Sequence, residues 1–439
     1  MSRLPLAQGR GAGNRLKPEA PHGAPHHDAD ARHPTEARHE HEDEKDDFRS
    51  RAAGSRLRVQ HGGHRFAPKH FPFQPLPKPR GKAPYRFDLS QLLHEDGVHH
   101  IVRSKRMVLH VVGDTGDERG KEMDFVAEMM TEDYDASPHS GVPAFLYHLG
   151  DVVYFAGDTD AYGECFYETY GDYPAPIVAI AGNHDCQPDD PQDGPIDSKK
   201  KPLDGWVQNF MSDDPTRLGS LKTTSSRTQM DLPNVYWTFT TPLATIIGLF
   251  SNVSEAEAEI HKDQIEWFQG ELAAAAKADP KKALIVAIHH PPFSGDVEHS
   301  GSTEAEKVLF KSFETTGVWP HLILSGHVHN YQRFSVREKI GRSNFDISCV
   351  VIGNCGYSRL GKLHKIGGAY PRTPLRLSNS LTLQKYDQDN YGFLRLEVTP
   401  DAIFGAYSSA PFAEARRPAM KVQDRWKIPL RRVTTQSSA

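Results

Sequence analysis

The stretch MVLHVVGDTG, residues 107–116, decides the fold: an apolar run ends in glycine, and an aspartate follows. An apolar run that stops at a polar side chain recurs in FLYHLGDVVY (145–154), IVAIAGNHD (177–185), ALIVAIHHP (283–291) and LILSGHVH (322–329), with a glycine at the junction in all but ALIVAIHHP. A buried strand that ends in this way places a polar side chain at the carboxyl edge of a parallel sheet, where ligands bind in α/β folds. The sequence therefore predicts one polar site assembled from five strand ends.

The polar residues of these motifs are of the types that bind metal ions. Phosphate esters resist hydrolysis because their oxygens carry or develop negative charge, and two cations roughly 4 Å apart meet this need. Such a pair requires one carboxylate that bridges both ions, and Asp151 is the candidate. The other predicted ligands are Asp114 and His329 on one ion, and Asn183, His289 and His327 on the other.

From Met107 to His329 the order of the motifs resembles the calcineurin-like metallophosphoesterase superfamily, with its pattern D-x-[HG], GDxx[DY], GNH[DE], H and GHxH. Many members carry a metal-binding histidine where this chain has Gly116. Tyr154 ends the second motif, a combination similar to the purple acid phosphatase branch. The alternative is that Tyr154 is an ordinary core tyrosine.

The resemblance implies a four-layer α/β/β/α sandwich of two mixed β-sheets flanked by helices. It also implies an Fe(III) ion and a divalent ion (Fe, Zn or Mn). By this resemblance, Asp114, Tyr154 and His329 would bind Fe(III), Asn183, His289 and His327 would bind the divalent ion, and Asp151 would bridge the two.

The resemblance also implies catalytic roles. His184 would steady the phosphate or protonate the leaving oxygen, Asp185 would orient His184, and His290 and His299 are further candidates for substrate binding. The expected reaction is in-line attack by a metal-bound hydroxide on a phosphomonoester, as in an acid phosphatase. The alternatives are a phosphodiesterase or nucleotidase on the same site, a nucleic-acid processing enzyme, and a catalytically inactive metal-binding or scaffolding protein.

Composition divides the 439 residues into three parts. Residues 1–83, rich in His and Pro, are expected to be a disordered tail and connector, because they lack the apolar periodicity of a core. Residues 84–409 form the predicted catalytic domain, with a possible cap at 186–233, and residues 410–439 a basic C-terminal tail.

Bulk properties give only weak indications about partners. The net charge of −5 does not indicate nucleic-acid binding. We expect a small phosphorylated substrate, and the oligomeric state is left open. The chain shows no apolar run of about 18 residues and no apolar signal segment near its start, which favours a cytoplasmic location.

The remaining elements follow from periodicity. The sequence predicts a β-hairpin at residues 234–241 and 243–251. It also predicts an amphipathic helix at residues 254–278 and a second helix at Thr303–Thr315. The last third of the chain is rich in strands, which we expect to be antiparallel members of a second sheet.

Overall fold

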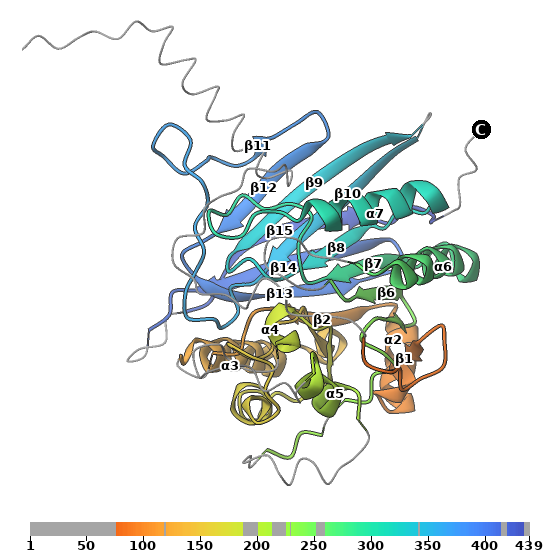
Figure 1. The fold of residues 1–439 in the computed structure, drawn as a ribbon, viewed down its shortest axis with the longest axis vertical. Helices are drawn as coiled ribbons and strands as arrows, with labels where there is room; N and C mark the ends of the chain where they lie inside the picture. Colours follow the sequence, from red (N-terminus) through yellow and green to blue (C-terminus); the bar gives the residue numbers. More distant parts are fainter. Residues whose placement is uncertain are drawn as a thin grey trace, which may run out of the picture.

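Two mixed β-sheets pack face to face between helices in the computed structural model (Figure 1). The structure describes residues 76–117, 120–187, 201–212, 225–228, 230–251, 260–340, 343–413 and 419–433. The nine-stranded sheet has the order β1 (Arg86–Asp88), β5 (Trp237–Thr240), β6 (Ala244–Leu249), β7 (Ala283–Ile288), β8 (Leu322–Ser325), β10 (Ser343–Ile352), β9 (Tyr331–Ile340), β12 (Leu381–Asp387) and β11 (Leu375–Arg376). The six-stranded sheet has the order β15 (Lys421–Pro429), β14 (Ala402–Ala410), β13 (Tyr391–Val398), β2 (Met107–Val112), β3 (Pro143–His148) and β4 (Ile177–Ala179).

The hydrophobic core lies on both faces of the nine-stranded sheet, as strand β7 illustrates. Successive side chains of a strand point to opposite faces. Ala283, Ile285 and Ala287 belong to the cluster shared with the six-stranded sheet. Leu284, Val286 and Ile288 belong to the cluster under helices α6 (Lys262–Ala278) and α7 (Thr303–Thr316). A strand buried on both faces is a continuous apolar run, which explains why ALIVAI carries no polar residue.

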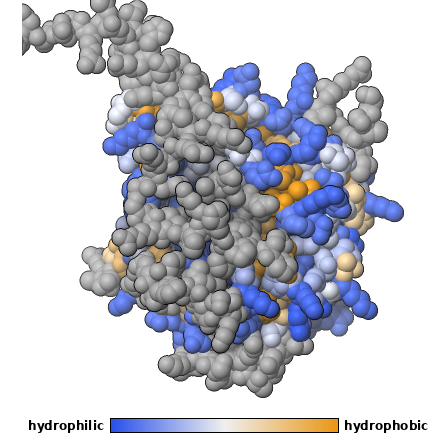
Figure 2. All heavy atoms as spheres, in the orientation of Figure 1, coloured by the Kyte–Doolittle hydropathy of each residue, from blue (hydrophilic) through white to orange (hydrophobic). Residues whose placement is uncertain are grey.

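The other helices lie beside the six-stranded sheet, and α3 contacts β13. They are α2 (Glu95–Ser104), α3 (Glu122–Ala136), α4 (Asn183–Cys186) and α5 (Asp204–Phe210), with short turns η1 (Leu89–Gln91), η2 (His139–Gly141) and the π-helical η3 (Gly163–Glu168). The predicted four-layer α/β/β/α sandwich is thereby confirmed. Hydrophilic residues predominate over the part of the surface in Figure 2 that is not grey, as expected when apolar side chains fill the layers between sheets and helices.

Most predicted elements are present. The hairpin is β5–β6, which pair antiparallel, and the predicted second helix is α7. Helix α7 begins where the Ser302 side chain accepts a hydrogen bond from the backbone of Ala305, and it ends at Gly317 with φ of 68°. The amphipathic helix is α6, which begins at Lys262 rather than at residue 254; residues 254–259 of the predicted range lie outside the described residues, and Ile260 and His261 precede the helix.

The last third of the chain differs from the expectation. Its strands do not all join a second sheet: β9, β10 and β12 extend the nine-stranded sheet beyond β8, whereas β13 and β14 pair beside β2. Residues 421–429, part of the predicted C-terminal tail, form strand β15 at the edge of the six-stranded sheet. There the Asp424 carboxylate accepts hydrogen bonds from Arg333 at 2.7 and 3.1 Å, which ties this strand to β9.

The predicted cap is described only in part. Trp206, Phe210 and Met211 are buried, and the first two rings stack within α5. Residues 188–200, 213–224 and 229 of that region, and the predicted N-terminal tail up to residue 75, lie outside the described residues. Within the described parts of the chain, none of the helices combines the length and apolar character needed to cross a membrane.

Candidate metal centre

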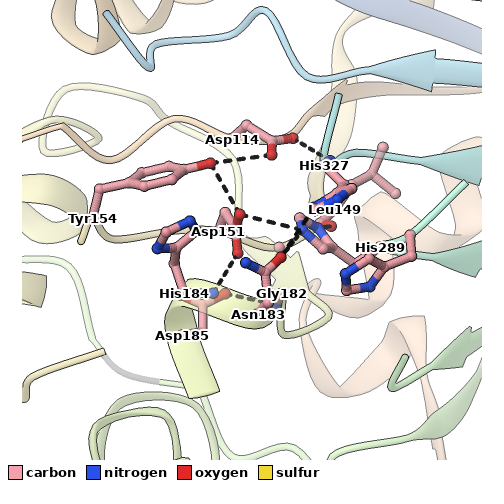
Figure 3. Close-up of polar contacts among 12 residues, drawn as sticks. Asp114, Leu149, Asp151, Tyr154, Gly182, Asn183, His184, Asp185, His289 and His327 are labelled. Atoms are coloured by element: carbon pink, nitrogen blue, oxygen red, sulfur yellow. Dashed lines mark hydrogen bonds and ion pairs between the residues drawn. The ribbon is translucent and has the colours of Figure 1, made fainter. Parts of the chain in front are cut away.

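The five motifs meet at the junction of the two sheets rather than along the edge of one. Strands β2, β3 and β4 are parallel neighbours in the six-stranded sheet, and β7 and β8 are parallel neighbours in the nine-stranded sheet. Because the loops that follow these strands converge, carboxylates from one sheet face imidazoles from the other (Figure 3). Three of the predicted ligands, Asp114, Asp151 and His327, have positive φ angles of 57°, 52° and 67°. Such conformations are uncommon outside glycine and cluster at functional sites.

One half of the centre is built around the Tyr154 hydroxyl, which is buried. It donates toward the Asp151 carboxylate at 2.9 Å and toward the Asp114 carboxylate at 3.2 Å, and it lies 3.2 Å from Nε2 of His329. The other Asp114 oxygen accepts the backbone N–H of His327 at 2.8 Å, which joins the two sheets. All four predicted ligands of this half are therefore brought together.

The other half is built around the Asn183 side-chain oxygen. It lies 3.1 Å from Nε2 of His289 and 3.1 Å from Nδ1 of His327. Nε2 of His289 is also 3.2 Å from the Asp151 carboxylate, so Asp151 touches both halves, as a bridging ligand must. Nδ1 of His289 contacts the Leu149 carbonyl oxygen at 2.8 Å, which fixes the orientation of the ring.

The donor set fits a metal cation. Asp151, His289 and His327 each offer one ligand atom, and these atoms all lie within 4.8 Å of one another. They are buried oxygen and imidazole nitrogen donors, of the kind that bind iron, zinc and manganese. Around them the backbone comes close enough to exclude side chains: a Cβ on Gly182 would lie 2.1 Å from an Asp151 carboxylate oxygen.

Electrostatics separates the two carboxylates. Burial would raise the pKa of Asp151, but the neighbouring His289 and His184 hold it well below the usual range. Burial raises the pKa of Asp114 well above its usual value, opposed in part by His289. Although burial lowers the pKa of His289, the Asp151 charge outweighs it and raises that pKa to about 9. In the absence of cations, the Asp151 carboxylate and the His289 imidazolium therefore form an ion pair, and a proton on Asp114 is favoured. Cations bound at the site would replace the protons on His289 and Asp114.

Gly116 stands where many family members have a metal-binding histidine, and the structure shows why a side chain is excluded there. A Cβ on Gly116 would lie 1.9 Å from the Val152 carbonyl oxygen and 2.6 Å from Cα of Val153. No real side chain tolerates such distances, so the loop after β3 occupies the space that a histidine would need. That same loop carries Tyr154, whose hydroxyl reaches Asp114 instead.

His184 borders the centre, with its ring centroid 4.3 Å from that of Tyr154. Its Nδ1 lies 2.8 Å from the Phe155 carbonyl oxygen, and its backbone N–H donates to Asp151. The predicted orienting contact from Asp185 is not what the structure shows. The Asp185 carboxylate instead accepts the backbone N–H groups of Gly182 and Val152, and it thereby braces the two loops that carry the ligands.

The other two sequence candidates occupy different positions. His290 is only 2% exposed, its Nδ1 lies 3.0 Å from the Ser251 hydroxyl, and its ring packs 4.2 Å from that of His327. His290 therefore supports a predicted ligand rather than facing a substrate. His299 is partly exposed, with its ring centroid 4.8 Å from that of His327 and 5.2 Å from that of His329, so it does border the centre.

Sequence reasoning missed Tyr357. Its ring lies 4.4 Å from the rings of both Tyr154 and His329. A signal was present, because Tyr357 is the last residue of the run ISCVVIGNCGY (347–357), in which β10 ends at Ile352 and glycines follow. Strand β10 is a parallel neighbour of β8, so its carboxyl end arrives at the same edge as His327.

Comparison with known proteins identifies the family. The calcineurin-like phosphoesterase family matches residues 107–331, about half of the chain, so this protein belongs to that family. Membership makes it a metal-dependent phosphoester hydrolase. Among curated protein sequences, none matches the chain significantly.

Solved structures are similar to this chain at low sequence identity. A purple acid phosphatase, PPD1 from yellow lupin (Lupinus luteus) seeds, is 15% identical with a TM-score of 0.51, over 74% of this chain and 54% of that chain. GAP50, the anchor in the inner membrane complex of Plasmodium, is 15% identical with a TM-score of 0.49, over 75% of this chain and 90% of that chain. PhoD is 13% identical with a TM-score of 0.46, over 76% of this chain and 72% of that chain. At 15% identity the likeness to the purple acid phosphatase concerns the fold alone.

Proposed function

We propose that this chain is a phosphomonoesterase of the acid phosphatase type with two metal ions, Fe(III) and a divalent ion. The observation that carries the proposal is the Tyr154 hydroxyl, held among the carboxylates of Asp114 and Asp151 and the His329 imidazole. A phenolate is a hard anionic oxygen ligand that suits ferric iron, whereas neutral imidazole and amide donors suit a divalent ion.

The ordinary-core reading of Tyr154 is less well supported. The Tyr154 hydroxyl contacts two carboxylates and an imidazole at once, whereas the buried Tyr331 hydroxyl donates to a single carboxylate, that of Asp424. Burial, and then the nearby Asp151 and Asp114 charges, raise the pKa of Tyr154 well above its usual value. A phenol between two carboxylates without a cation is unfavourable to ionise, and a trivalent cation at that position would reverse this preference. The proposed ligands are Asp114, Tyr154 and His329 for Fe(III), Asn183, His289 and His327 for the divalent ion, and Asp151 as the bridge.

The bound ions would supply a nucleophile at neutral pH and would neutralise the phosphoryl oxygens. The protein contributes the remaining steps. The Phe155 carbonyl contact places the proton of a neutral His184 ring on Nδ1, since a carbonyl only accepts. As an imidazolium, His184 can donate from Nε2 to the departing alkoxide oxygen. His299, at the border of the centre, would bind a phosphoryl oxygen, and Asp185 holds the loops in register.

Initial rates on p-nitrophenyl phosphate and bis-p-nitrophenyl phosphate test this proposal, measured on one preparation of known metal content. A strong preference for the monoester supports the phosphatase. A preference for the diester would overturn it in favour of a phosphodiesterase. Hydrolysis of neither compound by the metal-loaded protein would favour a scaffolding role.

A further inference from the structure

A loop that the proposed reaction does not use borders the metal centre. It follows β10 and runs from Gly353 to Gly361. Tyr357 in this loop packs against the rings of Tyr154 and His329, and the Gly361 backbone N–H donates to the His329 carbonyl at 2.8 Å. Arg359 lies between these two anchored points and is exposed. Arg359 thus lies two residues along the chain from Tyr357 and two from Gly361, the points at which this loop contacts the proposed ligands.

A second loop lies beside the first and carries Glu298 and His299. The Asp296 carboxylate accepts the backbone N–H groups of both residues at 2.8 and 2.9 Å, so their positions are defined. Arg359 and Glu298 form an ion pair between the two loops. His299, the next residue, reaches the rings of His327 and His329, which places this ion pair one residue from a side chain that borders the centre.

Backbone pairing makes the two loops one structure. The Val297 N–H donates to the Lys362 carbonyl at 2.8 Å, and the His364 N–H donates to the Gly295 carbonyl at 2.9 Å. The Asp296 carboxylate also accepts from the Asn330 side chain at 2.9 Å, one residue after His329. Arg359 is thus presented from a paired and anchored rim.

The segment of the rim that carries Arg359 has ionisable acid and base side chains of one sign only. Between Tyr357 and Arg376 the sequence contains five Lys or Arg residues and no Asp or Glu: Arg359, Lys362, Lys365, Arg372 and Arg376. Glu298 neutralises Arg359, but the two side chains are 56% and 34% exposed. Exposed ion pairs are weak, because water competes for both partners. A ligand anion that approaches the centre can therefore displace Glu298, and Arg359 can pair bidentately with it.

We propose that Arg359 binds a second anionic group on the substrate, so that the preferred substrates are phosphomonoesters whose leaving group carries a further phosphate or carboxylate. This inference rests on the proposed phosphomonoesterase function. Glu298 acts as the internal competitor: it holds the guanidinium in place when the substrate lacks a second charge, and it yields when one is present.

Two substrates that differ by one carboxylate test this inference: phenyl phosphate and 4-carboxyphenyl phosphate. The variants are Arg359→Gln and Glu298→Gln. Arg337→Gln is the matched control, since Arg337 forms a similar exposed pair with Asp346 on the β9–β10 hairpin. All are assayed at low ionic strength on the metal-loaded protein, because salt screens exposed charges.

We expect Arg359→Gln to lower kcat/KM for 4-carboxyphenyl phosphate about tenfold, the effect of losing one charge-assisted contact, with phenyl phosphate changed by less than about twofold. Glu298→Gln should raise kcat/KM for the carboxylated substrate, and Arg337→Gln should change neither rate. An equal loss on both substrates, or an unchanged ratio, in Arg359→Gln would overturn this role while the phosphatase stands. A wild-type protein that hydrolyses neither monoester would overturn the phosphatase proposal as well.

Discussion

Replacing His184 with alanine should slow the enzyme on poor leaving groups and leave its metal centre intact. The side chain is partly exposed, and its ring makes one hydrogen bond, to the Phe155 carbonyl oxygen at 2.8 Å. Losing that bond should destabilise the fold by only about 1 kcal/mol. A positioned general acid contributes about 100-fold or more to the rate when the leaving oxygen needs a proton. We therefore expect kcat on phenyl phosphate to fall about 100-fold in His184→Ala.

The assay compares kcat on phenyl phosphate with kcat on p-nitrophenyl phosphate, whose more acidic phenol leaves without a proton. The p-nitrophenyl rate should fall much less, and the metal content should match the wild type. His99→Ala is the control, because His99 is an exposed histidine on α2 with its side chain 53% exposed. Equal losses on the two substrates, or full activity on phenyl phosphate, would refute the acid role of His184.

Three further substitutions test the site and the fold. Asp151→Asn removes the charge that touches both halves of the centre, so metal content by elemental analysis and activity should be lost together; two retained metals would contradict the bridging role. Gly116→Ala would place a Cβ 1.9 Å from the Val152 carbonyl oxygen and should lower the free energy of unfolding by about 3 kcal/mol. The control Gly270→Ala, on α6 with no neighbouring element within 4 Å of the new Cβ, should raise the free energy of unfolding slightly. Equal melting temperatures for Gly116→Ala and the wild type would show that the loop around Gly116 relaxes freely. Burial, with a smaller effect from Arg431, lowers the pKa of His321 to about 4. Because the unfolded chain takes up the proton near pH 6.5, stability should fall by about 3 kcal/mol as the pH drops from about 6.5 to 4. In His321→Gln, measured by denaturant titration across this range, that part of the slope should disappear, and an unchanged slope would assign the pH dependence to other groups.

The strands that carry the site could be predicted because their burial is uniform. Strands β2 and β7 are entirely buried, so β7 is a short apolar run and β2 is one apart from His110, and a glycine or a polar residue marks the end of each. The order of the motifs was enough to predict that their polar ends meet. The sequence could not show that they meet across two sheets, since the pairing of β2 with β13 joins residues far apart in the chain.

Contacts made by the backbone were the least predictable part of the site. The Phe155 carbonyl that orients His184 leaves no trace in residue type, because any residue supplies a carbonyl. Asp185 was expected beside His184 from adjacency alone, yet its carboxylate is directed to the N–H groups of Gly182 and Val152. Strand β15 was not predicted because it is an edge strand with exposed charged residues, and its composition is therefore that of a solvated segment.

The most direct test of the binuclear centre is the metal stoichiometry and visible spectrum of wild-type protein and Tyr154→Phe. A phenolate bound to ferric iron absorbs visible light. We therefore predict two metal ions per chain, at least one of them iron, and a visible band that disappears in Tyr154→Phe. A colourless wild-type protein with both sites filled, or a band that persists in Tyr154→Phe, would contradict the assignment of Tyr154 as a ligand.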